Sequence, residues 1–438
     1  MSESVKRIWR HVSSIGFLAV FLIYGCGSGG GVVGPIAFAI AAGNGTSCVL
    51  LPNNRQIECW GVIPGTPSSV SSSASPTGVS GLTTATAISI SDASGHICVV
   101  IAGGTVQCWG NNTDGQLGNG TTTTSPALYS PPVPVTGIST AIAISAGGSH
   151  SCALLQSGAV QCWGLNTNGQ LGNGTGPQGP QGIAVDASGN VWVANYGNSS
   201  VTEIPKGAAS CSPASNCPSF TFTSTTSSST PVAVSGITTA TAISARGNST
   251  CAILGAGTVQ CWGANLNGQL GNATTKDSST PVAVAGITTA TAVSVGSEHA
   301  CAILSGGTLQ CWGLNNFGQL GNGTTTSSSS PVDVSGITTA IAVSAGANHT
   351  CALLINTTVQ CWGLNNTGQL GNGTNTNSSI PSPVYFQLIG VIAISVGVDQ
   401  SCALLSGGPV ECWGLNTYGQ VGNGTTTDSL IPVVVNGA

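Results

Sequence analysis

The feature that most constrains this chain is a fourteen-residue motif that returns along its length. It reads CWGLNNFGQLGNGT from Cys311, and close copies begin at Cys162, Cys361 and Cys412. The surrounding unit is about fifty residues long, and the first cysteines of seven copies fall at 48, 98, 152, 251, 301, 351 and 402. A period of roughly 20–50 residues indicates one repeated structural unit whose neighbouring copies bury a shared core.

Each unit contains four segments with the composition of β-strands. In the copy from Pro281 they read PVAV, ATAVSVG, HACAIL and TLQCWG. The small residues of ATAVSVG suit a crowded inner strand, and a proline at the start of PVAV suits an edge strand. Four strands per unit, repeated radially, predict an all-β propeller. Because the last unit ends in IPVVVNGA, we expect the C-terminal strand to complete a blade alongside N-terminal strands and close the ring.

The segments GGSHSCAL and CWGLNNFGQLGNGT, with the fifty-residue period, resemble the repeat of the regulator of chromosome condensation family in its bacterial form. The resemblance covers residues 36–438 apart from one insertion, and it implies a seven-bladed β-propeller of four-stranded blades. The first copy departs from the pattern, since the segment after Cys59-Trp60-Gly61 has no Gly-Gln-Leu-Gly turn. Terminal repeats are often irregular.

The chain has 17 cysteines, and fourteen of them form seven local pairs. A hairpin between the members of a pair would place them on facing strand positions, close enough for a disulfide. Metal sites with two sulfurs each and reduced buried thiols are the alternatives. We predict disulfides in an exported chain. The pairs are Cys48/Cys59, Cys98/Cys108, Cys152/Cys162, Cys251/Cys261, Cys301/Cys311, Cys351/Cys361, Cys402/Cys412 and, in a segment of different character, Cys211/Cys217.

The N-terminus has the pattern of an export signal. A basic head, MSESVKRIWRH, precedes the short apolar run VSSIGFLAVFLIYG, and Cys26 follows. The residues before Cys26 resemble a bacterial lipobox, which predicts a lipoprotein signal peptide over 1–25, a lipidated Cys26 and a glycine-rich tether over 26–35. A plain cleaved signal or an uncleaved anchor is the alternative. The expected location is the bacterial outer membrane, the periplasm or the cell surface.

The regular spacing of the repeat is interrupted within the third copy. The interval from Asn173 to Pro231 exceeds the usual one by 49 residues, and the extra segment, about 176–225, contains GIAVDASGNVWVANYGNSSVTEI. This stretch resembles a single NHL-type propeller repeat. Its length would suit an eighth blade. Because it enters between two strands of one blade, we predict seven blades with a three-stranded decoration. Trp192 and Tyr196 are its packing face or an exposed contact patch.

Composition excludes several functions. Charged residues make up 4% of the chain and the net charge is −5. The basic residues Arg55, Lys206, Arg246 and Lys276 are isolated, whereas binding to nucleic acid needs clustered cations. No nucleophile motif is present, so we identify no catalytic residue and no cofactor, although converging loop carboxylates would leave an enzyme open.

Two residue types recur once per copy. A tryptophan follows the second cysteine, and packing between blades is favoured over a carbohydrate-stacking ring. His96, His150, His299 and His349 stand two residues before a first cysteine, where Thr46, Ser249 and Gln400 replace histidine in other copies. The family resemblance implies a structural histidine, and we predict no metal, with a histidine ring as the alternative. The tryptophans are Trp60, Trp109, Trp163, Trp262, Trp312, Trp362 and Trp413.

Variation between copies is confined to a small window before the Gly-Gln-Leu-Gly turn. If the ring binds a ligand, this window and the insertion are the expected contacts. The candidate binding residues are Asp114, Asn168, Trp192, Tyr196, Asn267, Phe317, Thr367 and Tyr418.

Three functions follow from these observations. The favoured hypothesis is a monomeric, lipid-anchored binding scaffold that recognises another protein at the cell envelope. The second is a carbohydrate-binding, hydrolytic or lyase propeller. The third is guanine-nucleotide exchange, which the family resemblance implies and which export and an acidic balance oppose.

Overall fold

A computed structural model describes residues 39–51, 55–62, 72–82, 84–93, 95–123, 131–175, 180–185, 191–195, 200–204, 227–385 and 388–437. Every regular element in these ranges is a β-strand, and no helix in them could span a bilayer. The proposed signal peptide, Cys26 and the tether lie outside the described residues, as do Tyr196, Cys211 and Cys217.

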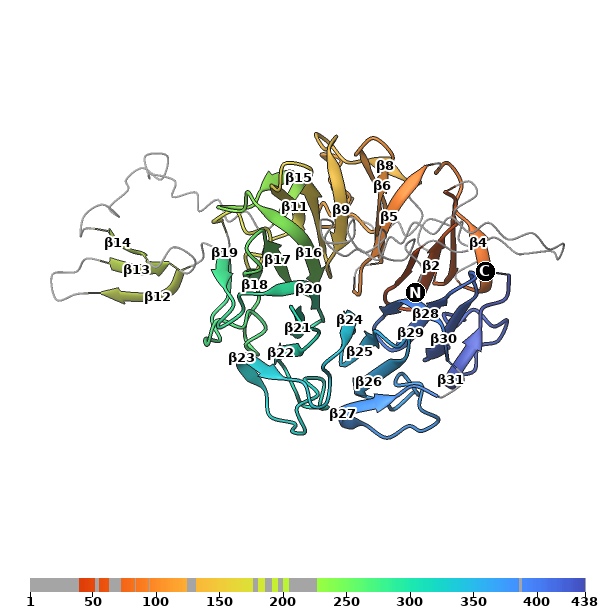
Figure 1. Cartoon of the computed structure of the whole chain (residues 1–438). Coiled ribbons are helices and arrows are strands. Elements are labelled where there is room, and N and C mark those ends of the chain that lie inside the picture. The colour runs from red at the N-terminus through yellow and green to blue at the C-terminus, as the bar shows by residue number, and fades with distance from the viewer. Residues whose placement is uncertain are drawn as a thin grey trace.

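Seven four-stranded antiparallel sheets surround a common axis (Figure 1), which confirms the seven-bladed all-β prediction. Within a blade the chain runs from the inner strand through the second and third strands to the outer strand. Blade 1 contains β1 (Ala39–Ala42), β2 (Thr46–Leu50), β3 (Ile57–Gly61) and β4 (Ser73–Gly78). Blade 2 contains β5 (Ala85–Ile90), β6 (His96–Ile101), β7 (Val106–Gly110) and β8 (Val133–Pro134). Blade 3 contains β9 (Ala141–Ala146), β10 (His150–Leu155), β11 (Val160–Leu165) and β15 (Ser227–Ala233).

The remaining four blades follow the same order. Blade 4 contains β16 (Ala240–Arg246), β17 (Ser249–Leu254), β18 (Val259–Gly263) and β19 (Ser278–Ala283). Blade 5 contains β20 (Ala290–Val295), β21 (His299–Leu304), β22 (Leu309–Gly313) and β23 (Ser328–Asp333). Blade 6 contains β24 (Ala340–Ala345), β25 (His349–Leu354), β26 (Val359–Gly363) and β27 (Ser378–Pro383). Blade 7 contains β28 (Val391–Val396), β29 (Gln400–Leu405), β30 (Val410–Gly414) and β31 (Ser429–Val434).

A disulfide joins the second and third strands of every blade. In blade 5 the register places Cys301 opposite Cys311, and their Cα atoms lie 4.0 Å apart. The hairpin brings the two side chains to one side of the sheet, as the sequence predicted. The seven bonds are Cys48–Cys59, Cys98–Cys108, Cys152–Cys162, Cys251–Cys261, Cys301–Cys311, Cys351–Cys361 and Cys402–Cys412.

The hydrophobic core lies between blades, and the repeated tryptophans are its largest buried side chains. Trp312 of blade 5 is fully buried, and its indole Nε1–H donates to the Gln269 carbonyl of blade 4 at 2.9 Å. In the same turn a Cβ at Gly271 would lie 2.8 Å from the Trp312 ring, so the second glycine of Gly-Gln-Leu-Gly leaves room for the neighbouring indole. The tryptophans therefore serve packing, as predicted.

A belt of serine side chains links the inner strands around the axis. Each serine hydroxyl accepts the backbone N–H of the next blade, at 2.8–3.0 Å. Between blades 1 and 2, where Ala41 occupies the serine position, Asn44 N–H donates to the Ser91 carbonyl at 3.3 Å instead. The serine pairs are Ser89–Ala146, Ser145–Ala245, Ser244–Val295, Ser294–Ala345, Ser344–Val396 and Ser395–Ala42.

The closure of the ring corrects one expectation. The C-terminal strand β31 pairs with β30 of its own blade and not with an N-terminal strand. The ring closes where blade 1 contacts blade 7: Ala42 N–H donates to Ser395 Oγ, and Trp60 Nε1–H donates to the Gln420 carbonyl. The first copy supplies its own outer strand, β4, so each blade is complete and no shared blade is needed.

The insertion leaves blade 3 after β11 and returns at β15, which pairs with β11. Its strands β12 (Pro180–Val185), β13 (Val191–Asn195) and β14 (Ser200–Ile204) form a separate three-stranded sheet, drawn outside the ring in Figure 1. Seven blades with a three-stranded addition is thus the architecture, and Trp192 lies on its central strand β13.

Candidate functional site

The variable turns after the third strands and the point where the insertion leaves blade 3 lie on one face of the ring. In an antiparallel blade the inner and third strands run in the same direction, so the loops that follow them emerge on one side. We call this side the loop face. Side-chain bonds join the two kinds of loop there: Gln170 Nε2 donates to Asn248 Oδ1 at 3.4 Å, and Gln369 Nε2 donates to Asp399 Oδ1 at 3.3 Å.

The repeated turns of the loop face are fixed from within. Asn315 Oδ1 accepts the Leu320 N–H at 2.9 Å, while its Nδ2 donates to the carbonyls of Thr324 and Thr326 at 3.1 and 3.0 Å. The side chain of Gln319 adds a bond from Phe317 N–H at 3.0 Å. Side-chain bonds of this kind replace a regular ladder in a turn. The constant Asn and Gln therefore hold the backbone, which leaves the residues between them to vary.

Six of the predicted binding residues occupy equivalent places in these turns. Tyr418 is 49% exposed, whereas the other five are half-buried. The residue immediately before each of the six is exposed, and Leu266 reaches 76%. The structure places these predicted residues at solvent-facing turns, and each turn also exposes a neighbour that the prediction did not name. The six predicted residues are Asp114, Asn168, Asn267, Phe317, Thr367 and Tyr418.

The four histidines lie beneath the loop face and are fully buried. Each ring Nε2 forms a bond of 2.8–2.9 Å with a hydroxyl of the following blade, as in His299 with Thr350. Burial lowers the pKa of His96, His299 and His349 to about 3 and that of His150 to about 4, so all are neutral near pH 7. Within the described ranges, no three His, Cys, Asp or Glu side chains gather as metal ligands would.

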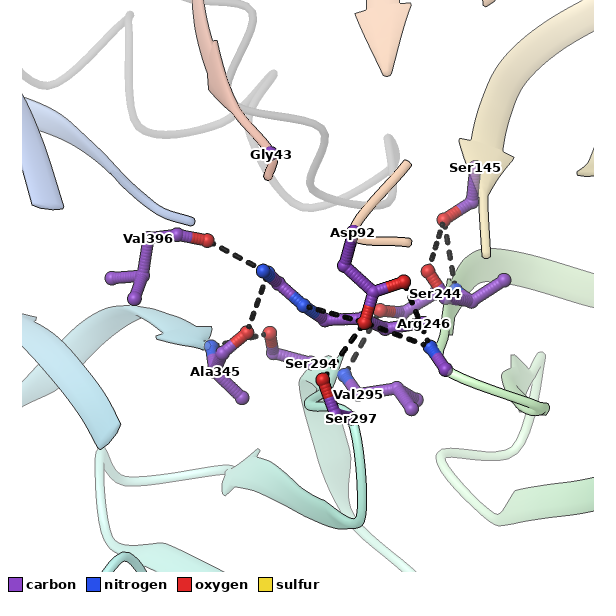
Figure 2. Close-up of polar contacts among 12 residues, drawn as sticks. Gly43, Asp92, Ser145, Ser244, Arg246, Ser294, Val295, Ser297, Ala345 and Val396 are labelled. Carbon is purple, nitrogen blue, oxygen red and sulfur yellow. Dashed lines mark hydrogen bonds and ion pairs between the residues drawn. The ribbon is translucent and has the colours of Figure 1, made fainter. Parts of the chain in front are cut away.

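An ion pair crosses the ring axis at the loop face (Figure 2). Arg246 ends the inner strand of blade 4, and its Nε lies 3.5 Å from Oδ2 of Asp92 in blade 2. Its Nη1 donates to the carbonyls of Ala345 in blade 6 and Val396 in blade 7, at 3.1 and 2.7 Å. One side chain thereby connects four blades, and it is 9% exposed.

The Asp92 carboxylate is held on several sides. Ser297 Oγ donates to its Oδ2 at 2.8 Å, and Gly247 N–H lies 3.3 and 3.2 Å from Oδ1 and Oδ2. Burial lowers the pKa of Arg246, and the attraction of Asp92 partly opposes that shift. Burial also raises the pKa of Asp399, while Arg246 acts in the opposite direction. The cluster is a fixed, charged crosspiece of the ring.

Two departures from the repeat make room for this arginine. In blade 3 the equivalent position is Gly147, where a Cβ would lie 2.2 Å from the His150 ring. In blade 4 both residues differ, because Arg246 replaces the glycine and Ser249 replaces the histidine. From the sequence, Arg246 was interpreted as isolated and was not connected with Asp92. The sequence signal that could have revealed this ion pair is that one copy replaces both the usual glycine and the usual histidine.

Comparisons with known proteins agree with this architecture. Residues 143–438 match the family described as the RCC1-like domain, and residues 103–154 match the regulator of chromosome condensation (RCC1) repeat. The probable E3 ubiquitin-protein ligase HERC3 of Homo sapiens is 41% identical over 87 residues, which is 20% of this chain. The chain spans about 8% of the length of that relative.

Two solved structures share the fold. Human WBSCR16 superposes with a TM-score of 0.63 at 20% identity, covering 86% of this chain and 89% of that one. Yeast RCC1 (Prp20), in a structure bound to Kap60, gives a TM-score of 0.66 at 17% identity, covering 95% of this chain and 90% of that one.

Proposed function

Because this chain belongs to the RCC1-like domain family, we propose that it is an exported, lipid-anchored scaffold whose loop face binds another protein at the cell envelope. The observation that carries the proposal is the construction of that face. Constant Asn and Gln side chains fix the turns of blades 2 to 7, while the residues between them vary from blade to blade and reach solvent. Rigid presentation of variable residues suits specific protein recognition, because little loop entropy is lost on binding.

Exposed apolar side chains give this face its contact points. Leu266 is 76% exposed and Tyr418 is 49% exposed, on turns of blades 4 and 7. Yeast RCC1 is bound to Kap60 in its solved complex, and Prp20p from Saccharomyces cerevisiae has also been characterised for its binding to Gsp1p and histones. Protein binding by these relatives supports a protein partner here.

The alternatives have less support in the geometry. A sugar-stacking ring needs accessible aromatic faces, whereas the seven repeated tryptophans are buried between blades. Nucleotide exchange rests on the family resemblance and has no separate observation in its favour. We therefore retain the protein-binding proposal.

A capture experiment from cell envelope tests the binding face. The soluble ring lacking Cys26 should retain a partner, and Leu266→Ser with Tyr418→Ser should release it. The matched control is Ile355→Ser, which removes a side chain that is 56% exposed on the opposite face. Equal loss in both variants would contradict a loop-face site. Binding to a glycan array with no captured protein would favour the carbohydrate-binding alternative.

The anchor is tested separately from the face. Expressed as the full chain, the protein should partition with membranes and incorporate a labelled fatty acid. Cys26→Ser should abolish the label and move the protein to the soluble fraction after signal cleavage. Unchanged labelling in Cys26→Ser would show that this cysteine is not the lipidated residue.

A further inference from the structure

The inner strands of the seven blades enclose a cavity on the ring axis. Its volume is about 190 Å³, and residues from each of the seven inner strands line it. A single buried water needs only about 10–15 Å³ by a comparable measure, so the space accommodates a small molecule. Its walls combine apolar side chains such as Ile88 and Ile394 with the serines of the belt.

The lining serines present hydrogen-bond donors to this space. Each has already accepted a backbone N–H from the next blade, and the O–H group of each has no acceptor among the described residues. A hydroxyl carries one donor, so these O–H groups are available to a ligand. All five are half-buried, which means that solvent reaches them. They are Ser89, Ser244, Ser294, Ser344 and Ser395.

Arg246 adds a positive charge to the same cavity. Its Nη1 bonds two carbonyls, whereas its Nε, 3.5 Å from Asp92 Oδ2, and its Nη2 are buried with no hydrogen-bond partner in the described part of the chain. A buried donor without an acceptor is costly, and the cost is larger for a charged group. The side chain lines the cavity while being 9% exposed.

We propose that the axial cavity binds a small oxyanion, held by the hydroxyls of the serine belt and attracted by the positive charge of Arg246, which borders the cavity. A guanidinium and several O–H groups supply donors, which is the chemistry that recognises carboxylate and phosphate oxygens. The Asp92 carboxylate is already engaged by Arg246, Ser297 and Gly247 N–H, and the nearby Asp399 carboxylate accepts a bond from Gln369. This leaves the donors in excess and disfavours a cation. Anion binding in the cavity does not depend on a protein partner at the loop face.

Calorimetric titration of the full chain with inorganic phosphate and with propionate tests the site. At least one of these anions should bind saturably with one site per chain, and the better one identifies the oxyanion class. Arg246→Gln should weaken its binding about a hundredfold, because it removes the positive charge beside the cavity.

Two serine variants keep the test decisive if Arg246→Gln does not fold. Ser344→Ala and Ser145→Ala each remove one belt bond to the next blade, at 3.0 and 2.8 Å. Ser344 lines the cavity, whereas Ser145 does not, and its hydroxyl also contacts the Ala245 carbonyl at 3.4 Å. Ser344→Ala should weaken binding about tenfold. Ser145→Ala should leave it unchanged.

Three results would overturn the proposal. Neither anion binds the wild-type chain, in which case the cavity holds water. Alternatively, a folded Arg246→Gln binds the anion as tightly as wild type. Equal weakening by Ser344→Ala and Ser145→Ala would show that the belt acts only through ring geometry.

Discussion

Blades 3 and 4 are neighbours with the same strands, the same disulfide position and the same buried tryptophan, yet their inner loops differ. Blade 3 has Gly147 against the ring of His150, which bonds Thr250 of the next blade at 2.8 Å. Blade 4 has Arg246 and Ser249, and its contact extends across the axis to Asp92. The difference shows that glycine and histidine form one unit, and that replacing both converts a bond between neighbours into a bond across the ring.

Acid should destabilise the histidine copies while sparing blade 4. Histidine titrates at 6.5 ordinarily, and the folded pKa values here are about 3 to 4. The unfolded chain binds protons that the folded chain excludes, so stability is complete above pH 6.5 and falls toward pH 3–4. By pH 5 each histidine should cost about 2 kcal/mol, or roughly 8 kcal/mol for four. Urea unfolding midpoints between pH 7 and 5 measure this.

The matched variant for the acid effect is His299→Gln, since Gln400 naturally fills this position in blade 7 and donates to the Gly43 carbonyl at 2.8 Å. It should remove about a quarter of the pH dependence. If the unfolding free energy of this variant depended on pH as strongly as that of the wild type, the buried histidines would not be the cause of the acid effect. Measurements should stay above pH 5, because burial raises the pKa of Asp399, Glu58 and Glu411, which act in the opposite direction.

Restoring the repeat's glycine in blade 4 should have the next largest effect. Arg246→Gly leaves the Asp92 carboxylate buried without its cation, and such losses cost about 3–5 kcal/mol. Adding Asp92→Asn should recover part of the stability in a double-mutant cycle of unfolding free energies. The control is Lys276→Ala, at an exposed cation, with an effect within about 0.5 kcal/mol. Equal effects of Arg246→Gly and Lys276→Ala on the unfolding free energy would show that the crosspiece does not stabilise the ring.

The smallest expected effect concerns blade 3. Gly147→Ala should cost about 1–3 kcal/mol, because the added Cβ would overlap the His150 ring. Combined with His150→Ser, the substitution should cost less than the sum of the two single changes. Thermal unfolding of the wild type, the two single variants and the double variant gives the coupling energy. Strict additivity would show that the glycine and the histidine act independently.

The local architecture could be predicted because its information lies within one copy. Paired cysteines fixed the hairpin register, and the proline-led segment indicated an edge strand. The insertion could be placed because the segments on either side of it belong to one blade. These inferences need contacts over a few tens of residues at most.

The crosspiece and the ring closure depend on contacts that a single copy does not contain. Gly247 and Asp92 are 155 positions apart, and Arg246 and Val396 are 150 apart. Periodicity gives each copy the same role and therefore hides a residue whose partner lies two or three blades away. The exposure of Leu266 was missed for a different reason, since the side-chain direction in a turn depends on its dihedral angles and not on its variability.

Complete blades give the ring a seam. Polypeptide crosses every junction between consecutive blades, but blades 7 and 1 are held together, among the described residues, by noncovalent bonds such as Ser395–Ala42, Trp60–Gln420 and Gln400–Gly43. In a propeller with a shared blade, paired strands from the two ends of the chain hold that junction together, whereas here hydrogen bonds between two complete blades do so. Under tension this junction can separate without breaking a blade, so mechanical opening of the ring should begin there.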